Sequence, residues 1–344
     1  MKAFFYGHSA GLGAGHFVRS LRLAEEARSC GWETFALWPG PELECLNRSK
    51  IELLRLPELV GRKVDLSILS KRTEVLRNFI RDWVPDVVVV DLMPFGYGGE
   101  LVDVLLEEGR SRFVWGLPYA ERESNRLKNP RLKKAFSRYA EVLVYGEKEP
   151  DDPLEAYADF ELPRASHVGV VTEILSRWVP ESPKTVACLV GSGGLAGGDS
   201  LRRRLRDALP EEVRIRFVAG PLGDIGERRE LPGVEDIQES SLADALRGVT
   251  AVVSRAGYNT SYALMTASVP VVFVPSSWPE QFARARALSS LPGVHCLDES
   301  ELSKLWPLLQ SGPEVVERDL PFRLSGSSAA IEVLERVVRK GVPR

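Results

Sequence analysis

Residues 252–281, VVSRAGYNTSYALMTASVPVVFVPSSWPEQ, contain the pattern of one complete βαβ unit. The first apolar run predicts a strand, and the turn at residues 254–257 leads directly into polar residues that favour the start of a helix. A second apolar run, residues 270–275, predicts the next strand, and a loop carrying Glu280 and Gln281 follows it. Strand, helix and strand in this order predict an α/β fold with a parallel sheet.

The start of the helix in this stretch is suited to an anion. The first N–H groups of a helix have no partner inside the helix, and the positive end of the helix dipole points the same way. We therefore expect the turn to bind a phosphate of the ligand, with Glu280 and Gln281 over the same edge of the sheet. The residues of the turn are Ser254, Arg255, Ala256, Gly257, Asn259 and Thr260.

The composition describes a globular protein. A chain of 344 residues is long enough for two domains, and its net charge of -3 gives no reason to expect a nucleic-acid partner. The chain has no run of roughly 18 apolar residues, and its N-terminal apolar run is too short for a signal peptide. Its four cysteines form no CxxC pair and are expected to be free thiols. We expect a cytoplasmic protein.

A glycine-rich loop, HSAGLGAGH at residues 8–16, follows the first apolar strand and precedes a helix. It lacks the third glycine of a dinucleotide-binding loop and the GK[ST] of a phosphate-binding Walker loop. Gly13 and Gly15 would bring the backbone close to a ligand, and His16 would lie at the helix start. The helix dipole there favours a neutral imidazole, as a general base requires. His8 is a second candidate, and a bracing role remains open for both histidines.

Residues 86–91, DVVVVD, are apolar between two acids, which predicts a central parallel strand covered on both faces. Ligands of such sheets bind at the carboxyl ends of the strands. Asp91 ends this strand and Glu100 ends the loop after it, so each is a candidate to orient an acceptor hydroxyl or to polarise His16. The alternative for both acids is to cap the next helix.

Residues 122–138 carry seven Arg or Lys side chains. One interpretation is a solvated helix face, and the other is a patch for an anionic acceptor or a membrane surface. The stretch has no interleaved aromatic residues of the kind that single-strand nucleic-acid binders use.

The second half begins after a proline-rich, irregular region, in which residues 168–171 are predicted to form a short strand. Residues 185–190, TVACLV, predict a buried strand that ends at a second glycine-bearing turn. This turn and the one at residues 254–257 would hold one pyrophosphate, or they are simply tight turns between strand and helix. The residues of the second turn are Gly191, Ser192, Gly193 and Gly194.

SRAGYNTSYA and PEQ, separated by VPVVFVP, resemble the donor-binding half of GT-B glycosyltransferases, most closely the MurG-like group. The loop ending in His16 resembles the GxGH-type loop of that group, and DLMPFGYGGEL resembles predicted glycosyltransferases of the same kind. The resemblance covers nearly the whole chain. It implies an α/β GT-B fold with two Rossmann-like domains and a cleft between them. The expected parts are an acceptor-side domain at 1–165, a linker at 166–184, a nucleotide-sugar-binding domain at 185–322, and a C-terminal helix at 323–344 that packs back on the first domain.

The resemblance also implies a function. It predicts inverting transfer of a sugar from a nucleoside diphosphate sugar, with a UDP-sugar such as UDP-GlcNAc favoured, to a hydroxyl of a small-molecule or lipid-linked acceptor. His16 would be the base, backbone near Leu242 would contact the nucleotide base, and Glu280 with Gln281 would hold sugar hydroxyls. No DxD tripeptide occurs, so we expect a metal-independent enzyme without a cofactor. Residues 122–138 would provide peripheral contact with the inner membrane face.

One position departs from the family pattern. MurG-like enzymes often carry a glutamate on the helix after the SRAG turn, where it holds the ribose hydroxyls, and this chain has Ala263. A methyl group cannot accept those hydrogen bonds. Two alternatives therefore stay open: a sugar-nucleotide hydrolase of the same fold, and a catalytically inactive sugar-nucleotide-binding subunit.

Overall fold

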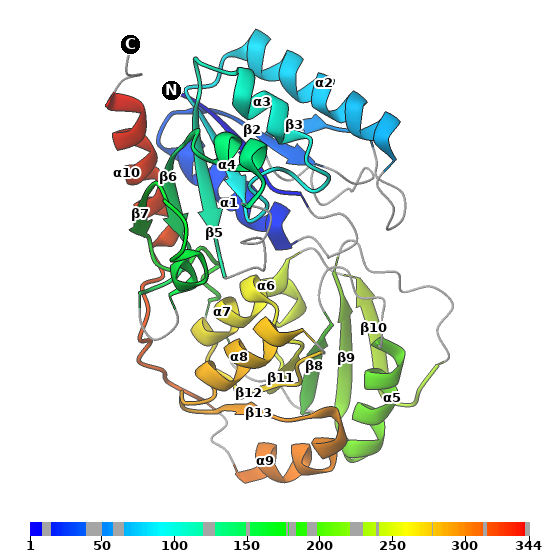
Figure 1. The fold of residues 1–344 in the computed structure, drawn as a ribbon. Helices are drawn as coiled ribbons and strands as arrows, with labels where there is room; N and C mark the ends of the chain where they lie inside the picture. The colour runs from blue at the N-terminus through cyan, green and yellow to red at the C-terminus, as the bar shows by residue number, and fades with distance from the viewer. Residues whose placement is uncertain are drawn as a thin grey trace. The chain divides into compact units, whose positions relative to one another are not determined.

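The chain divides into two compact units, each built around its own sheet (Figure 1). The structure is a computed structural model, and it describes residues 1–8, 15–38, 50–57, 65–119, 128–148, 152–176, 178, 184–190, 198–220, 230–238, 241–276, 278–311 and 315–340. The first unit comprises Met1–Leu12, His16–Thr172 and Phe322–Arg344, and the second comprises Gly13–Gly15 and Glu173–Pro321.

The described strands of the first unit form a seven-stranded sheet in the order β3-β2-β1-β4-β5-β6-β7, and every pair in it is parallel. All five residues of β4 are buried, as its uninterrupted apolar sequence predicts for a central parallel strand. The strands are β1 Lys2–Tyr6, β2 Glu33–Trp38, β3 Glu52–Arg55, β4 Val87–Asp91, β5 Arg112–Leu117, β6 Tyr139–Val144 and β7 Arg164–His167.

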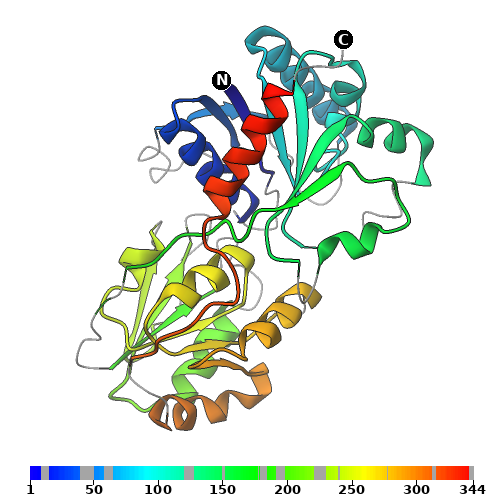
Figure 2. The same cartoon turned by 90° about the vertical axis from the view of Figure 1, so that its left-hand side faces the viewer.

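Helices cover both faces of this sheet. α2, α3 and α4 pack against the face that presents Phe4, Val88 and Trp115. α10 lies across β5 and β6 (Figure 2, red), although it is the final helix in the sequence. No described helix is long and apolar enough to cross a bilayer. The helices of the first unit are α1 Gly15–Ser29, α2 Leu66–Trp83, α3 Leu101–Glu107, α4 Pro130–Phe136, the 3₁₀ helix η3 Pro153–Tyr157, and α10 Gly326–Arg339.

Local sequence explains where α2 begins and ends. The side chain of Asp65 accepts a hydrogen bond from the Ser67 backbone N–H at 2.8 Å, which satisfies one of the unpaired N–H groups at the helix start. Val84 then adopts a left-handed conformation (φ 50°), and Pro85 cannot continue the helix. Arg72, Leu76 and Ile80 are buried at intervals of four residues, so the face that α2 turns to the sheet carries one arginine.

The expectation of a strand at residues 168–171 is wrong, because β7 lies just before it. The apolar side chains of these residues are buried for another reason. The Val170 N–H donates to the carbonyl of Arg323 at 2.8 Å, and the Gly326 N–H donates to the carbonyl of Val170 at 3.2 Å. The Val168 N–H still donates to the carbonyl of Val144 at the end of β6, at 3.0 Å. From Val170 onward the segment pairs with the chain that enters α10.

The described strands of the second unit form a six-stranded sheet in the order β10-β9-β8-β11-β12-β13, again with parallel pairs. Its strands are β8 Thr185–Leu189, β9 Arg214–Ala219, β10 Val234–Gln238, β11 Ala251–Ser254, β12 Val271–Phe273 and β13 Val294–Cys296. Its helices are α5 Gly198–Ala208, α6 Leu242–Ala245, α7 Tyr258–Thr266, α8 Pro279–Leu288, the 3₁₀ helix η4 Glu299–Lys304, and α9 Leu305–Ser311.

Both sheets reverse their strand order at the centre, between β1 and β4 in the first unit and between β8 and β11 in the second. In open parallel sheets, ligands bind outside the carboxyl ends of the strands at such a reversal. These two edges are therefore where functional side chains are expected.

Candidate functional site

His16 and Asp91 meet at the reversal in the first sheet. Asp91 is the last residue of β4, and His16 lies in the first turn of α1, the helix that follows β1. The His16 Nδ1 atom is 2.8 Å from Asp91 Oδ1, and both side chains are buried. Of the two acids predicted to polarise His16, the structure places Asp91 against it.

Arg19 completes this cluster one turn along α1. Its Nε donates to Asp91 Oδ2 at 2.7 Å and its Nη2 donates to Oδ1 at 2.6 Å, which is the bidentate geometry of a strong arginine–carboxylate pair. Arg19 is only 1% exposed. Burial would raise the pKa of the Asp91 carboxyl, but the charge of Arg19 and the hydrogen bonds from His16 and Arg19 hold that pKa below its ordinary value.

The charge state of Asp91 assigns the tautomer of His16. An ionised carboxylate can only accept hydrogen bonds, so His16 Nδ1 must carry the proton that it donates to Oδ1. In a neutral imidazole the lone pair then lies on Nε2. The 3.1 Å approach of Arg19 Nη2 to His16 Nδ1 is a consequence of their sharing one carboxylate oxygen, because a protonated Nδ1 cannot accept. An unprotonated Nε2 of this kind is able to accept a proton.

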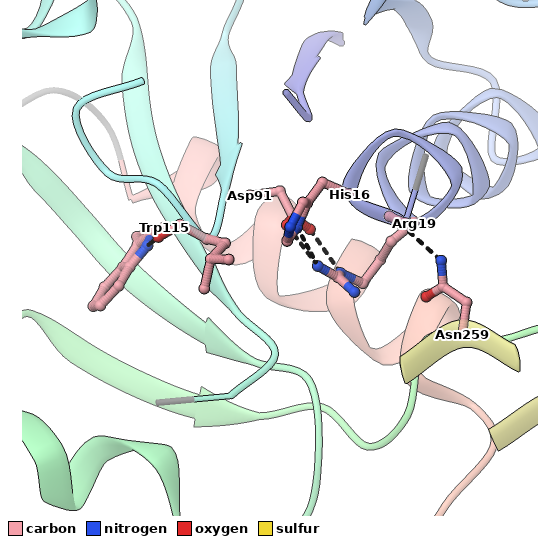
Figure 3. Close-up of polar contacts among 7 residues, drawn as sticks. His16, Arg19, Asp91, Trp115 and Asn259 are labelled. Carbon is pink, nitrogen blue, oxygen red and sulfur yellow. Dashed lines mark hydrogen bonds and ion pairs between the residues drawn. The ribbon is translucent and has the colours of Figure 1, made fainter. Parts of the chain in front are cut away.

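The chain that leaves Asp91 is held in a fixed and strained conformation. Leu92 has a left-handed backbone (φ 57°), which is unfavourable for a residue with a Cβ atom. Its N–H donates to the carbonyl of Gly116 at 2.7 Å, and its carbonyl accepts from the indole of Trp115 at 2.9 Å (Figure 3). Trp115 is fully buried, so it holds the end of β4, and with it Asp91, in place.

Glu100 belongs to a separate buried cluster. Its Oε1 accepts from the Tyr6 hydroxyl and from Arg72 Nη2, each at 2.7 Å, and its Oε2 accepts from the Gly98 N–H at 2.8 Å. Although Glu100 stands at the N-cap position of α3, its side chain makes no capping bond. Burial raises its pKa, but the charge of Arg72 together with the hydrogen bonds from Tyr6 and Arg72 holds the pKa below its ordinary value. Its carboxylate is occupied by these donors, and it does not contact His16.

His8, the second candidate base, follows β1 and is buried. Its ring stacks on Tyr97 with centroids 4.9 Å apart. Burial, together with the charge of Arg72, lowers the pKa of His8 to about 3. It is therefore neutral, but its ring is committed to a stack of aromatic side chains.

In the second unit, β11 ends at Ser254, and the turn after it leads into α7. Ala256 in this turn has a left-handed backbone (φ 61°) and is completely buried. Gly257 is the N-cap of α7 and supplies no side-chain cap. Asn259 and Thr260 stand in the first turn of the nine-residue helix. The strand end is thus followed by a helix N-terminus without a side-chain cap. That an anion binds there stays a prediction.

Two arginines hold this turn. Arg284 of α8 donates to the carbonyl of Ala256 at 2.7 Å, and its guanidinium lies 5.6 Å from the centre of the Tyr258 ring. Arg255 donates to the carbonyl of Val274 at 3.3 Å and forms an ion pair with Glu299 at 2.5 Å. The strained peptide of Ala256 is thus fixed from the neighbouring helix.

The remaining predicted donor residues lie around the same sheet edge. Gln281 Oε1 accepts from the N–H and the hydroxyl of Ser276, at 3.0 and 2.7 Å, and so fixes the loop after β12. Glu280 is half-buried in the first turn of α8. Leu242 begins α6, whose N-cap Ser241 accepts from the Asp244 N–H. Ala263 is buried within α7.

Some of the predicted site residues lie outside the described part of the chain, and the basic stretch at residues 122–138 is described only in part. Gly13, the turn Gly191, Ser192, Gly193 and Gly194, and residues 122–127 of the basic stretch lie outside, whereas Gly15 is the first residue of α1. Within the described part of the basic stretch, Pro130–Phe136 forms α4, and its Arg131 pairs with Asp103. Among the described residues, no group of three His, Cys, Asp or Glu side chains is placed to hold a metal ion.

The partners that decide these clusters, Tyr6, Arg72 and Arg19, were not among the candidate site residues predicted from the sequence. One signal would have found the two arginines. Arg72 stands four and eight residues before the buried Leu76 and Ile80, and Arg19 stands four and eight before Leu23 and Ala27. An arginine on the apolar stripe of a helix needs a buried acid as partner.

No family model matches the chain. Two curated relatives are both named as UDP-N-acetylglucosamine--N-acetylmuramyl-(pentapeptide) pyrophosphoryl-undecaprenol N-acetylglucosamine transferases. The protein from Limosilactobacillus fermentum is 23% identical, with 94% of this chain and 93% of the relative covered. The protein from Listeria welshimeri is 25% identical, with 86% of each covered.

Solved structures agree on the fold. A UDP-glucosyltransferase from Polygonum tinctorium matches with a TM-score of 0.61 and 15% identity, covering 98% of both chains. MurG from Acinetobacter baumannii matches with a TM-score of 0.57 and 17% identity, covering 98% of this chain and 99% of that one. These likenesses confirm the α/β fold class predicted from the motifs. The chain has the GT-B fold, and along most of its length it resembles the MurG-type N-acetylglucosamine transferases.

Proposed function

We propose that the protein is an inverting, metal-independent glycosyltransferase, with UDP-GlcNAc as the favoured donor and a hydroxyl of a lipid-linked molecule as acceptor. The observation that carries the proposal is the His16–Asp91 contact. It leaves Nε2 of a buried, oriented imidazole to take the acceptor proton. Both curated relatives are named as transferases of this kind, which favours transfer over hydrolysis or binding alone.

The proposal assigns the donor to the second unit. As the pyrophosphate leaves, the sugar carbon acquires positive character and the leaving group acquires negative charge. The N–H groups at the start of α7 would stabilise that charge without a metal. Gly191–Gly194 would contribute from the neighbouring strand end, Glu280 and Gln281 would hold sugar hydroxyls, and backbone near Leu242 would contact the base.

A lipid-linked acceptor would place the protein at the inner membrane face. The exposed basic side chains of α4, Arg131, Lys133 and Lys134, support this part of the proposal, because they would be attracted to anionic headgroups.

The test is turnover of labelled UDP-GlcNAc with an N-acetylmuramyl-(pentapeptide) pyrophosphoryl lipid as acceptor, in the presence of a chelator. We expect transfer with inversion at the sugar carbon. His16→Ala should lower turnover by roughly 10²–10⁴-fold while UDP binding by calorimetry is retained, and His295→Ala in β13 is the matched control. Rapid release of UDP without any acceptor would assign the hydrolase instead. Absence of UDP binding together with absence of turnover would overturn the proposal.

A further inference from the structure

We propose that Arg19 is a positioning residue that sets the electrostatic balance at His16. By pairing with both oxygens of Asp91, it offsets the carboxylate's charge without displacing the hydrogen bond that orients the imidazole. The inference rests on the proposed function, because it concerns the base of that reaction.

In this geometry Asp91 orients the imidazole, while Arg19 offsets the charge of Asp91. Asp91 Oδ1 accepts from His16 Nδ1, which fixes the ring and its tautomer. The same carboxylate accepts two hydrogen bonds from Arg19, one on each oxygen, so its charge is shared with a buried cation (Figure 3). Asp91 and Arg19 are both almost fully buried, and solvent screens their charges little.

The other groups near His16 add little charge. His8, at the end of β1, is neutral because its pKa is about 3. Glu100 and Arg72 form their own ion pair and offset each other. Tyr145, which directly follows β6, presents its ring to Arg19, and the centre of the ring lies 5.4 Å from the guanidinium. Of the described charged side chains, Arg19 and Asp91 are therefore the pair in direct contact with the imidazole.

The sheet makes room for this arrangement. Gly116 of β5 lies opposite Asp91 in the strand register, and a Cβ atom at Gly116 would stand 2.2 Å from the Tyr145 hydroxyl oxygen. A side chain at this position of β5 would displace the ring against which Arg19 lies. Gly116 thus preserves the space on which the position of the guanidinium depends.

The arrangement predicts the direction in which removing each of the two charges should change the pH dependence of the reaction. A carboxylate alone beside an imidazole stabilises the imidazolium form, and a nearby cation destabilises it. If Arg19 offsets Asp91, removing the guanidinium should keep His16 protonated, and inactive as a base, up to a higher pH. Removing the carboxylate charge should have the opposite effect, and removing both should restore the balance.

The experiment compares pH–rate profiles of the wild type, Arg19→Met, Asp91→Asn and the double variant, with Arg28→Met at the exposed end of α1 as control. In Arg19→Met the acidic limb should move to higher pH by about one unit or more. In Asp91→Asn it should move to lower pH, and in the double variant it should return toward the wild-type position. Arg28→Met should leave it unchanged. The proposal would be overturned if the acidic limb lay at the same pH in Arg19→Met and the wild type. It would also be overturned if the limb moved in the same direction in both single variants.

A second readout does not depend on turnover. Four histidines are present, so the ring signals of His16 can be assigned by their loss in His16→Gln. Titration of these signals by NMR should follow the same order as the acidic limbs, and the ring ¹⁵N shifts of the wild type should place the proton on Nδ1. If Arg19→Met does not fold, Arg19→Lys, which keeps the charge but loses the bidentate pairing, should titrate near the wild type. Titrations in the expected order without any turnover would refute the proposed function alone.

Discussion

The carbonyl oxygen of His16 lies against the backbone of Gly7, so closely that a Cβ atom at Gly7 would stand 2.5 Å from it. The same Cβ would be 2.3 Å from the hydroxyl oxygen of Ser20. The chain at the end of β1 is therefore in backbone contact with the first turns of α1. His16 can take its position because residue 7 is a glycine and has no side chain.

Gly7→Ala should force α1 away from β1. We expect the free energy of unfolding to fall by about 1–3 kcal/mol, the usual cost of an overpacked site, and turnover to fall with it, because His16 moves away from Asp91. Denaturant unfolding measures the first effect and steady-state kinetics the second. Gly109→Ala is the control, because its Cβ meets nothing within 4 Å. Equal stability of the two variants would contradict the steric argument.

His8 should make the protein sensitive to mild acid. Its ordinary pKa is 6.5 and its pKa in the folded protein is about 3. Between these values the unfolded chain binds a proton that the folded protein excludes. The free energy of unfolding should therefore decrease as pH falls below 6.5, by at most about 1.4 kcal/mol per pH unit from this group. His8→Phe keeps a ring beside Tyr97 and should flatten the curve, and parallel curves for the two proteins would refute the assignment.

The buried Arg72–Glu100 pair should be far more sensitive to loss of one charge than a surface pair of the same types. Glu100→Gln leaves Arg72 buried beside a neutral group, and we expect a loss of about 3–5 kcal/mol in unfolding free energy. Glu107→Gln, which breaks the exposed pair with Arg77, should cost less than about 1 kcal/mol.

The loss in Glu100→Gln should also depend on pH. Because the pKa of Glu100 is lowered on folding, its stabilisation is complete above its ordinary value of 4.5 and is lost as pH falls through the folded value. The difference between wild type and variant should therefore narrow in acid. A constant difference down to the acid transition would show that the charge of Glu100 is not what stabilises the fold.

Arg284 should matter for donor binding without touching the donor. Its hydrogen bond to the Ala256 carbonyl supports a left-handed peptide at the entrance of α7. Arg284→Met should let this turn relax and weaken UDP binding roughly tenfold, about 1.4 kcal/mol by calorimetry. Arg286→Met, on the exposed side of the same helix, should leave affinity unchanged. Unaltered binding in Arg284→Met would show that the turn needs no such support.

The sequence predicted the elements around the site well where the signal was local. The run DVVVVD became the buried central strand β4, and the SRAG turn became the entrance of α7. The strand predicted at residues 168–171 was misplaced, because β7 is Arg164–His167. The apolar residues after it contact the chain that enters α10, more than 150 residues later. Nothing in a local pattern separates that contact from pairing in a sheet.

The choice between Asp91 and Glu100 could not be made from the sequence either. Asp91 ends the strand and Glu100 ends the loop after it, and both were candidates to reach His16. What separates them is Arg72, which comes from α2 and holds Glu100 in its own cluster. The spacing of Arg72 on its helix indicates that it needs a buried acid, but it does not indicate which acid is the partner.

The contact of α10 with β5 and β6 has a consequence for biosynthesis. Domains generally fold in the order in which the ribosome delivers them. Here Ile331 and Leu334 of α10 are part of the core of the first unit, yet they are translated after the whole of Glu173–Pro321. The half of the protein that is made first must wait, with one face of its sheet incompletely covered, until its last helix leaves the ribosome.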